Sequence, residues 1–324
     1  MPLPTPLPAR HALRAVALAM LVLAPDLSAQ RNRDRDTRDS RDDGDVVRID
    51  TTVAFGPNGT VDLSQISGSI VVSAWNRKEA KISASTEYGY LRADFAGSRI
   101  SLEVRSRRGR IGDSEFRLQV PVGTRVIARS ISGDVTVSGL KSPAELRSVS
   151  GDIDLADGSD QVTLESVSGS VKARQLSGSV RAQSVSGDIE LAGVAGDIDA
   201  GTTSGEVSLR DVKSANVRAE TLSGDLEYRG TIDKVGRYEF KSHSGEVRLA
   251  MPEGAGATFS VSTWSGSVES VIPMRLEPSS ETTGRGRTKK MEFTVNGGGA
   301  RVSVSTFSGD ITIERAGARG KREE

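Results

Sequence analysis

Apolar and polar residues alternate over short stretches from Val46 onward, and this pattern predicts β-strands. Clear examples are residues 100–104 (ISLEV) and 116–120 (FRLQV), where every second residue is apolar. Gly, Asn and Ser residues separate the stretches and predict turns. After the N-terminal region, no stretch of about 12 residues shows helical periodicity. The sequence therefore predicts an all-β fold.

A short motif recurs along this region: a mostly apolar residue, then Ser-Gly, then Asp, Glu or Ser, then Val, Ile or Leu. Its glycines at positions 133, 151, 169, 187 and 205 are evenly spaced with a period of 18, and the period then lengthens to 19, 21 and 21 at Gly224, Gly245 and Gly266. Half-period copies surround Gly178 and Gly196. Gly309 follows Gly266 by about two long periods, so we expect its coil to lie beyond that of Gly266. Gly68 lies more than three periods before Gly133, so we expect degenerate copies or insertions between them.

An alternating strand that ends in Ser or Thr precedes most copies, as in residues 162–166 (VTLES). Period two places Val162, Leu164 and Ser166 on one face, and the chain bends at Gly169. Small Ser residues avoid collisions at the bend, and stacked hydroxyls are expected to hydrogen-bond to one another. A unit of roughly 18–21 residues with two short strands cannot bury its own apolar face, whereas a stack of units can. This favours a β-solenoid; an antiparallel β-sandwich or prism is the alternative, because a turn after Gly also suits hairpins.

The N-terminus has the features of an export signal. Arg10, His11 and Arg14 precede an apolar run, 15–25, which is shorter than the roughly 20 residues needed to cross a membrane. Small residues at 27–29 then offer a cleavage site. We expect a signal peptide at 1–29, a disordered charged linker at 30–45, a β-repeat domain at 46–315 and a polar tail at 316–324. The expected location is periplasmic, extracellular or cell-surface, without a transmembrane anchor after cleavage.

The amino-acid composition limits the kinds of binding and metal site that the chain can form. Lys and Arg number 43, as do Asp and Glu, so the basic excess of a nucleic-acid binder is missing. The chain has no Cys, and therefore neither a disulfide nor a lipid-attachment Cys. His243 is the only His beyond the leader, and it fills the variable apolar position of a repeat. A structural or exposed role is expected for it, and no zinc or transition-metal site.

Acidic pairs follow the repeat and predict an acidic stripe on one face if the coils stack in register. They are Asp152 and Asp154, Asp188 and Glu190, Asp197 and Asp199, and Asp225 and Glu227. A solvated, aggregation-resistant face is expected, with binding of cations or basic partners as the alternative. Calcium is not expected, since the double glycine of calcium-binding β-rolls is missing and Ser often replaces the acidic residue. Trp75, Tyr88, Tyr90 and Trp264 are expected to serve as packing or caps.

The Val-Ser-Gly-Asp-Ile repeats resemble the bacterial "putative adhesin" family of β-strand-repeat domains of unknown function. A second mark of the resemblance is a Pro-Gly segment that leads into a repeat, at 116–123 and again at 247–254. The resemblance covers residues 46–315. It implies a β-solenoid-like fold in a cell-envelope or extracellular setting, and it brings no catalytic or binding residues.

The sequence thus predicts an exported, non-catalytic β-repeat protein with a scaffold, adhesion or cell-envelope interaction role. Envelope or surface polymers or proteins are the expected partners, and no cofactor, metal ligand or catalytic residue is assigned. A periplasmic sensory or regulatory module is one alternative. A polysaccharide-active β-helix enzyme is another, but the carboxylates follow the repeat instead of forming one cluster.

Overall fold

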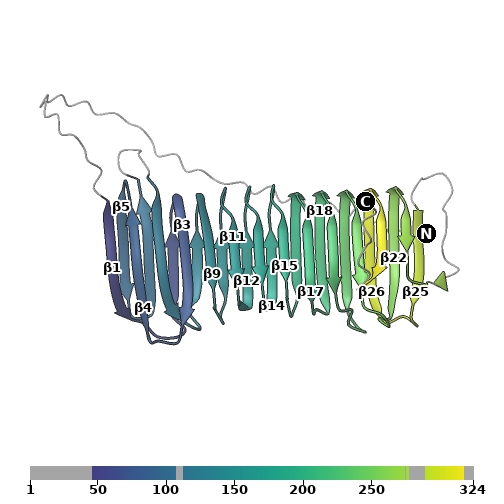
Figure 1. Ribbon diagram of the computed structural model, residues 1–324, viewed down its shortest axis with the longest axis horizontal. Helices are drawn as coiled ribbons and strands as arrows, with labels where there is room; N and C mark the ends of the chain where they lie inside the picture. The colour runs from purple at the N-terminus through teal and green to yellow at the C-terminus, as the bar shows by residue number, and fades with distance from the viewer. Residues whose placement is uncertain (1–45, 107–111, 274, 277–288, 317–324) are drawn as a thin grey trace, which may run out of the picture. The chain divides into compact units, whose positions relative to one another are not determined.

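A computed structural model describes residues 46–106, 112–273, 275–276 and 289–316 (Figure 1). Within these ranges the regular secondary structure consists of 27 β-strands, which run from Val47 to Arg315. No helix of these ranges is long and apolar enough to cross a bilayer. The expected signal peptide, charged linker and all but the first residue of the expected polar tail lie outside the described residues.

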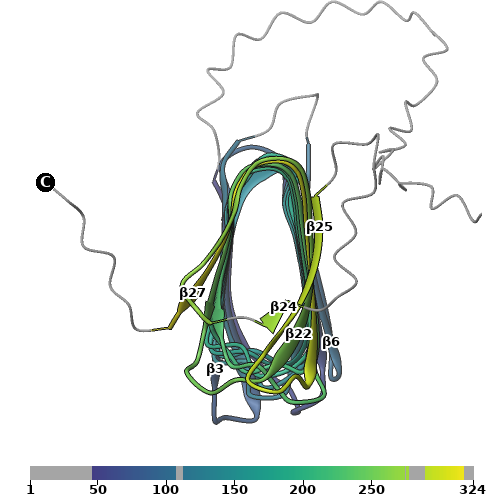
Figure 2. The same ribbon diagram turned by 90° about the vertical axis from the view of Figure 1, so that its right-hand side faces the viewer.

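The strands form two sheets that face each other (Figure 2). Sheet A has 13 strands and sheet B has 14. In spatial order, sheet A contains β1 (Val47–Ala54), β4 (Glu79–Thr86), β7 (Ser114–Pro121), β3 (Ser67–Trp75), β9 (Ser132–Ser138), β11 (Ile153–Ala156), β13 (Val171–Arg174), β15 (Ile189–Ala192), β17 (Val207–Val212), β19 (Leu226–Gly230), β21 (Val247–Met251), β27 (Ile311–Arg315) and β23 (Val268–Ser270). Sheet B contains β24 (Arg275–Leu276), β25 (Lys289–Val295), β22 (Ala257–Ser265), β26 (Ala300–Ser308), β20 (Arg237–Ser244), β18 (Asn216–Ser223), β16 (Ile198–Ser204), β14 (Ser177–Gln183), β12 (Ser159–Glu165), β10 (Ala144–Arg147), β8 (Arg125–Arg129), β2 (Thr60–Ser64), β6 (Arg99–Arg105) and β5 (Tyr90–Ala96).

The repeating unit is a coil: a strand of sheet B, a bend at Ser-Gly, a strand of sheet A, and a turn back to sheet B. β10 returns to lie parallel beside β8, with Ala144 paired to Val126, and β11 lies parallel beside β9. Among the described strands, antiparallel pairs occur only toward the ends of the sheets, at β1, β4 and β5 and at β24 and β25. Removing these five strands leaves eleven parallel strands in each sheet. The predicted β-solenoid is therefore confirmed, and parallel pairing excludes an antiparallel sandwich for the repeats.

The core lies between the sheets and follows the predicted alternation. Val162 and Leu164 point inward and are fully buried, as are their equivalents in neighbouring coils. In the longer coils that follow Gly205, Tyr228, Tyr238 and Phe240 fill the interior, with ring centroids 5.1–6.0 Å apart. The hydroxyl of Tyr238 donates to the Ser214 carbonyl at 2.6 Å, and that of Tyr228 to the Thr231 carbonyl at 2.7 Å. The added loop residues thus make room for large side chains and accept their hydrogen bonds.

The Ser-Gly corner is held by a hydrogen-bond ladder between coils. Ser166 is buried; its hydroxyl donates to the Gly151 carbonyl of the preceding coil at 3.3 Å and accepts from the Gly169 amide at 3.0 Å. Ser148, Ser184, Thr202, Thr221 and Ser242 donate in the same way. The expected hydroxyl-to-hydroxyl ladder is therefore wrong. Neighbouring coils are about 4.8 Å apart, which exceeds hydrogen-bond reach, while the glycine carbonyl lies closer.

Replacing Ser166 with alanine tests this ladder. We expect a loss of about 1–3 kcal/mol in the free energy of unfolding, because a buried amide and a buried carbonyl lose their side-chain partner. Urea denaturation measures the change. Ser168→Ala is the matched control, since Ser168 is exposed at the same corner and should change stability by less than about 0.5 kcal/mol. Equal effects of the two substitutions would show that the ladder contributes nothing.

The half-period glycines form part of the opposite corner. A Cβ on Gly178 would lie 2.2 Å from the Asp160 carbonyl oxygen, and one on Gly196 would lie 2.0 Å from that of Gly178. Gly178 has φ +101° and Gly196 has φ +139°, a region that favours glycine. The half-period repetition therefore reflects the two corners of one coil.

The first and last coils of the chain are inserted between other coils. At one end, β2 and β3 lie between β6/β7 and β8/β9, and Gly68 pairs with Gly133. At the other end, β26 and β27 lie between β20/β21 and β22/β23. One expectation is therefore wrong, because Gly309 lies between Gly245 and Gly266 instead of beyond them. The expected degenerate copies or insertions between Gly68 and Gly133 are present along the chain: β4 and β5 are added strands, and the coil of β6 and β7 has Ser114 in register with Gly68. In space, Gly68 and Gly133 lie in adjacent coils.

The Pro-Gly segments mark the places where the chain passes over an inserted coil. β7 ends at Pro121, and the chain continues to β8, which lies two positions away in the stack. β21 is followed by Pro252 and Gly254, and the chain again moves two positions, to β22. The last coil returns through residues 296–299, which pass so close to β22 that a Cβ on Gly256 would lie 2.3 Å from the Gly298 carbonyl oxygen. This Asn-Gly-Gly-Gly turn is thus a tight crossing of two backbone segments.

Candidate interaction surface

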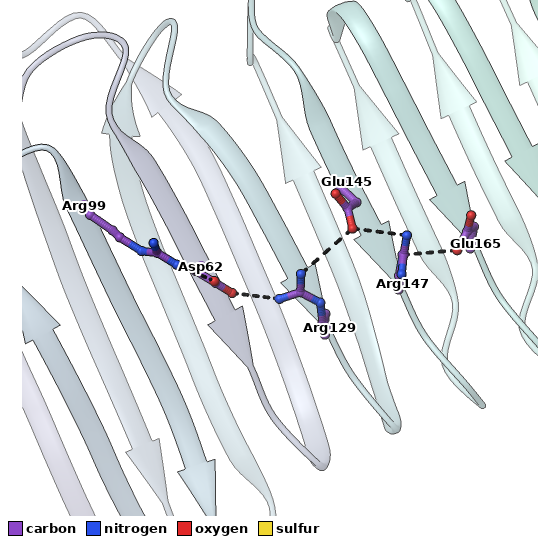
Figure 3. A network of polar contacts seen from close by, with 6 residues as sticks. All are labelled: Asp62, Arg99, Arg129, Glu145, Arg147 and Glu165. Carbon is purple, nitrogen blue, oxygen red and sulfur yellow. Dashed lines mark hydrogen bonds and ion pairs between the residues drawn. The ribbon is translucent and has the colours of Figure 1, made fainter. Parts of the chain in front are cut away.

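The outer face of sheet B carries alternating charges that pair across the strands. Figure 3 shows one such network, in which Asp62 accepts from Arg99 at 3.1 Å and from Arg129 at 2.9 Å. Arg147 bridges Glu145 at 3.2 Å and Glu165 at 3.1 Å. Exposed pairs of this kind stabilise proteins by about 0.2–1 kcal/mol each. Their main consequence is a hydrated face with balanced charge.

The predicted acidic stripe is divided among three places. Asp152, Asp188 and Asp225 follow the Ser-Gly bend, Asp154, Glu190 and Glu227 lie on sheet A, and Asp199 lies on sheet B, with Asp197 immediately before the same strand. The expectation of an acidic stripe therefore holds for the pairs that follow the Ser-Gly bend and is wrong for Asp197 and Asp199, because the repeat around Gly196 belongs to the opposite corner. On sheet A, Asp154 pairs with Arg174 at 3.4 Å and Glu227 with Arg210 at 3.0 Å.

The aspartates at the bend have a structural role. Asp152 accepts a hydrogen bond from the Ser170 amide of the next coil at 2.8 Å, and Asp188 accepts one from Glu206 at 2.8 Å. Hydrogen bonds from the amide and hydroxyl of Ser267 lower the pKa of Asp310. Within the described ranges no group of three or more His, Asp or Glu side chains is placed to hold a metal ion.

Glu206 lies where these carboxylates crowd together. Burial raises the pKa of Glu206, and the nearby carboxylates of Glu227 and Asp188 raise it further. Acidic residues therefore follow the bend in most coils, and we call them the acidic column: Asp134, Asp152, Asp188, Glu206, Asp225, Glu246 and Asp310. Ser170 interrupts the column between Asp152 and Asp188, and Glu246 pairs with Arg248.

An exposed apolar ridge runs along the same corner. At the bend, the inward Ser or Thr is followed by a residue that points outward, so each coil presents one side chain to solvent. The apolar ridge consists of Ile131, Val149, Val167, Val185, Thr203, Leu222, His243, Phe307 and Trp264, in spatial order. Ile131, Leu222, Phe307 and Trp264 are each 42–49% exposed.

Three aromatic rings stack at one end of this ridge. Phe307 lies between His243 and Trp264, with ring centroids 4.8 Å and 5.8 Å apart and planes within 8° of parallel. The stack exists because β26 is inserted between β20 and β22. His243 is exposed, which agrees with the prediction of a structural or exposed role for it. Trp264 packs on Phe307, as the expectation of packing requires, and at 42% exposure it is also part of the surface.

The other predicted aromatic residues lie away from the ridge. The Trp75 indole donates to the Glu79 carbonyl at 2.7 Å and lies under the Arg77 guanidinium, 4.8 Å from its ring centroid. Tyr88 and Tyr90 are exposed beside the start of β5. Sequence reasoning missed Phe307, Leu222 and Ile131 as surface residues. The sequence does contain a signal for them. The variable residue before Ser-Gly directly follows an inward-facing residue, so its own side chain must face the solvent.

Comparison with known families agrees with this architecture. The model of the Toastrack DUF4097 family matches residues 110–199 and, a second time, residues 197–314. The chain belongs to the Toastrack DUF4097 family. Each match contains one of the two Pro-Gly crossings, at Pro121 and at Pro252. The resemblance to an adhesin-like β-repeat family of unknown function is thereby confirmed. No curated protein matches the chain.

Solved structures also show similarity to this Toastrack chain. A "putative cell adhesion protein" from Clostridium sporogenes is 11% identical, with 83% of this chain and 100% of that chain covered and a TM-score of 0.24. A "putative lipid binding protein" from Parabacteroides distasonis is 10% identical, with 84% and 97% covered and a TM-score of 0.41. A "putative adhesin" from Parabacteroides merdae is 13% identical, with 65% and 90% covered and a TM-score of 0.32.

Proposed function

We propose that this Toastrack protein is an exported, non-catalytic adhesion or scaffold protein that binds a cell-envelope partner along the apolar ridge. The observation that carries the proposal is the ridge itself, in which Ile131, Val185, Leu222, Phe307 and Trp264 are exposed apolar side chains of one stack. The half-buried Val149 and Val167 and the polar Thr203 lie between them. Contiguous apolar surface in contact with water is unfavourable and is typical of interaction sites.

The stack supports binding by repetition. Successive ridge residues are spaced by one coil, about 4.8 Å, so an extended partner can contact many of them at once. Several weak contacts that are linked in this way give a high overall affinity, and no single deep pocket is needed. The three parallel rings at His243, Phe307 and Trp264 give the ridge its largest apolar area.

The acidic column defines the chemistry of the partner. It runs beside the ridge, and the lowered pKa of Asp310 keeps that carboxylate charged. A partner with apolar side chains next to Lys or Arg would match both features, because complementary charge favours encounter and orientation. The fitting partner is therefore an envelope or surface protein with an apolar, basic strip.

The double variant Phe307→Ser/Trp264→Ser tests the proposal. We expect at least about tenfold weaker binding of the purified protein to envelope fractions of its host, because exposed aromatic anchors dominate such contacts. Co-sedimentation measures the binding. The fold should persist, since both side chains lie outside the core.

Val235→Ser/Val271→Ser is the matched control. These residues are 90% and 70% exposed and lie off the ridge, so the control should bind like the wild type. Equal binding by the ridge variant and the wild type would contradict the proposal.

A further inference from the structure

Two neighbouring arginines depart from the charge pairing of sheet B. Arg237 on β20 and Arg301 on β26 are direct partners in register, and both are exposed. Arg129, Arg147 and Arg181 on the same sheet all pair with carboxylates. By contrast, neither the Arg237 nor the Arg301 side chain makes an ion pair or hydrogen bond with any residue that the structure describes.

On the side of β26 and β22, the described strands beside these two cations carry no carboxylate. Beyond Arg301, the outward residues of β26 and β22 are Ser303 and Ser305, and Thr258, Ser260 and Ser262. On β20, Glu239 pairs with Lys241 and with Arg218, and Arg237 adds only a weaker, longer-range attraction that helps to lower the pKa of Glu239. Like charges opposite each other destabilise a sheet. The pair thus carries a cost that a bound anion would remove.

The geometry suits one oxyanion. The two arginines leave adjacent strands, about 4.8 Å apart, so both guanidinium groups can reach the same carboxylate or phosphate. Arginine forms paired hydrogen bonds with either group. Beside Arg237 the surface is hollowed, and the carboxylates of Asp197, Asp199 and Glu239 line this hollow together with Asn216 and Arg218. The Asp197 carboxylate accepts a hydrogen bond from the Asn216 side-chain amide at 3.0 Å and makes none with Arg237. The oxyanion is therefore expected over the Arg237 and Arg301 pair, on the side of β26, and not in the hollow.

We propose that Arg237 and Arg301 bind an oxyanion group, carboxylate or phosphate, carried by an envelope polymer. This site begins β20 and β26, whereas His243 and Phe307 lie toward the ends of the same strands, about 20 Å away. It is independent of the apolar ridge and adds a polar contact on a different surface.

Binding to three polymers tests the site: polygalacturonate for carboxylate, inorganic polyphosphate for phosphate, and dextran as the neutral polymer. We expect the full-length protein to bind at least one anionic polymer and not dextran. The variant Arg237→Gln/Arg301→Gln should bind that polymer at least tenfold more weakly and lose the rise in Tm that the polymer causes. The polymer that binds identifies the source of the oxyanion.

The matched control is Arg129→Gln/Arg147→Gln, which removes the same charge from the same sheet. It should weaken binding less than twofold. An equal loss in both variants would show diffuse attraction by net charge, and would overturn the site, as would no binding of either anionic polymer. The ridge variant Phe307→Ser/Trp264→Ser should retain polymer binding, so failure of one proposal does not imply failure of the other.

Discussion

Replacing Gly169 with alanine is expected to lower the free energy of unfolding by about 3–5 kcal/mol, a loss at the upper end for single substitutions. The new Cβ would lie 2.0 Å from the Gly151 carbonyl oxygen and 2.5 Å from its carbon. Both are backbone atoms of the neighbouring coil, so neither can rotate away. Urea denaturation, followed by far-ultraviolet circular dichroism, measures the loss.

Gly97→Ala is the matched control for that experiment. Gly97 lies in the turn between β5 and β6, where an added Cβ would have no atom within 4 Å. We expect a change of less than about 0.5 kcal/mol. Comparable losses at Gly97 and Gly169 would mean that close stacking of the corners is not what requires glycine.

The second large effect is expected from Val304→Asp. Val304 lies on the inserted strand β26, is fully buried, and pairs in register with Phe240 on one side and Val261 on the other. An unpartnered carboxylate there should cost at least about 4 kcal/mol. Because β26 alone connects β22 to β20, we expect the coils from β22 onward to open while the coils from β8 to β19 stay folded.

Limited proteolysis, with cleavage sites located by mass spectrometry, measures this local opening. Ser303→Asp is the matched control, because Ser303 precedes Val304 and points outward, where a carboxylate stays in water. The control should leave the cleavage pattern unchanged. A Val304→Asp protein that resists proteolysis as well as the control would contradict the insertion of β26.

The regular coils could be predicted from sequence because two independent signals agree. The alternation in residues such as Val162 and Leu164 gives the inward face, and the constant spacing of Gly151, Gly169 and Gly187 gives the coil length. Both signals are local, so they do not depend on which coil lies next to which. The solenoid follows from them directly.

The inserted coils could not be predicted in this way, because sequence order usually predicts spatial order. A Pro-Gly segment occurs at both places, at Pro121 and at Pro252, but no local feature of the sequence indicates that such a segment passes over another coil. For the same reason, the aromatic stack and the arginine pair could not be predicted. Phe307 meets Trp264, and Arg301 meets Arg237, only because the last coil folds back between earlier ones.

The insertion that builds the aromatic end of the ridge can be tested directly by disulfide trapping, since the chain has no cysteine of its own. Lys241 on β20 is the register partner of Ser305 on β26, while Ser262 on β22 lies one strand further away. Adjacent strands bring Cα atoms to about 5 Å, within the range of a disulfide, and two strands separate them by about 10 Å, beyond it. We predict that mild oxidation cross-links Lys241→Cys/Ser305→Cys and leaves Lys241→Cys/Ser262→Cys reduced. Cross-linking of the second pair and not the first would show that the coils stack in sequence order, without the inserted coil and without the stack of His243, Phe307 and Trp264.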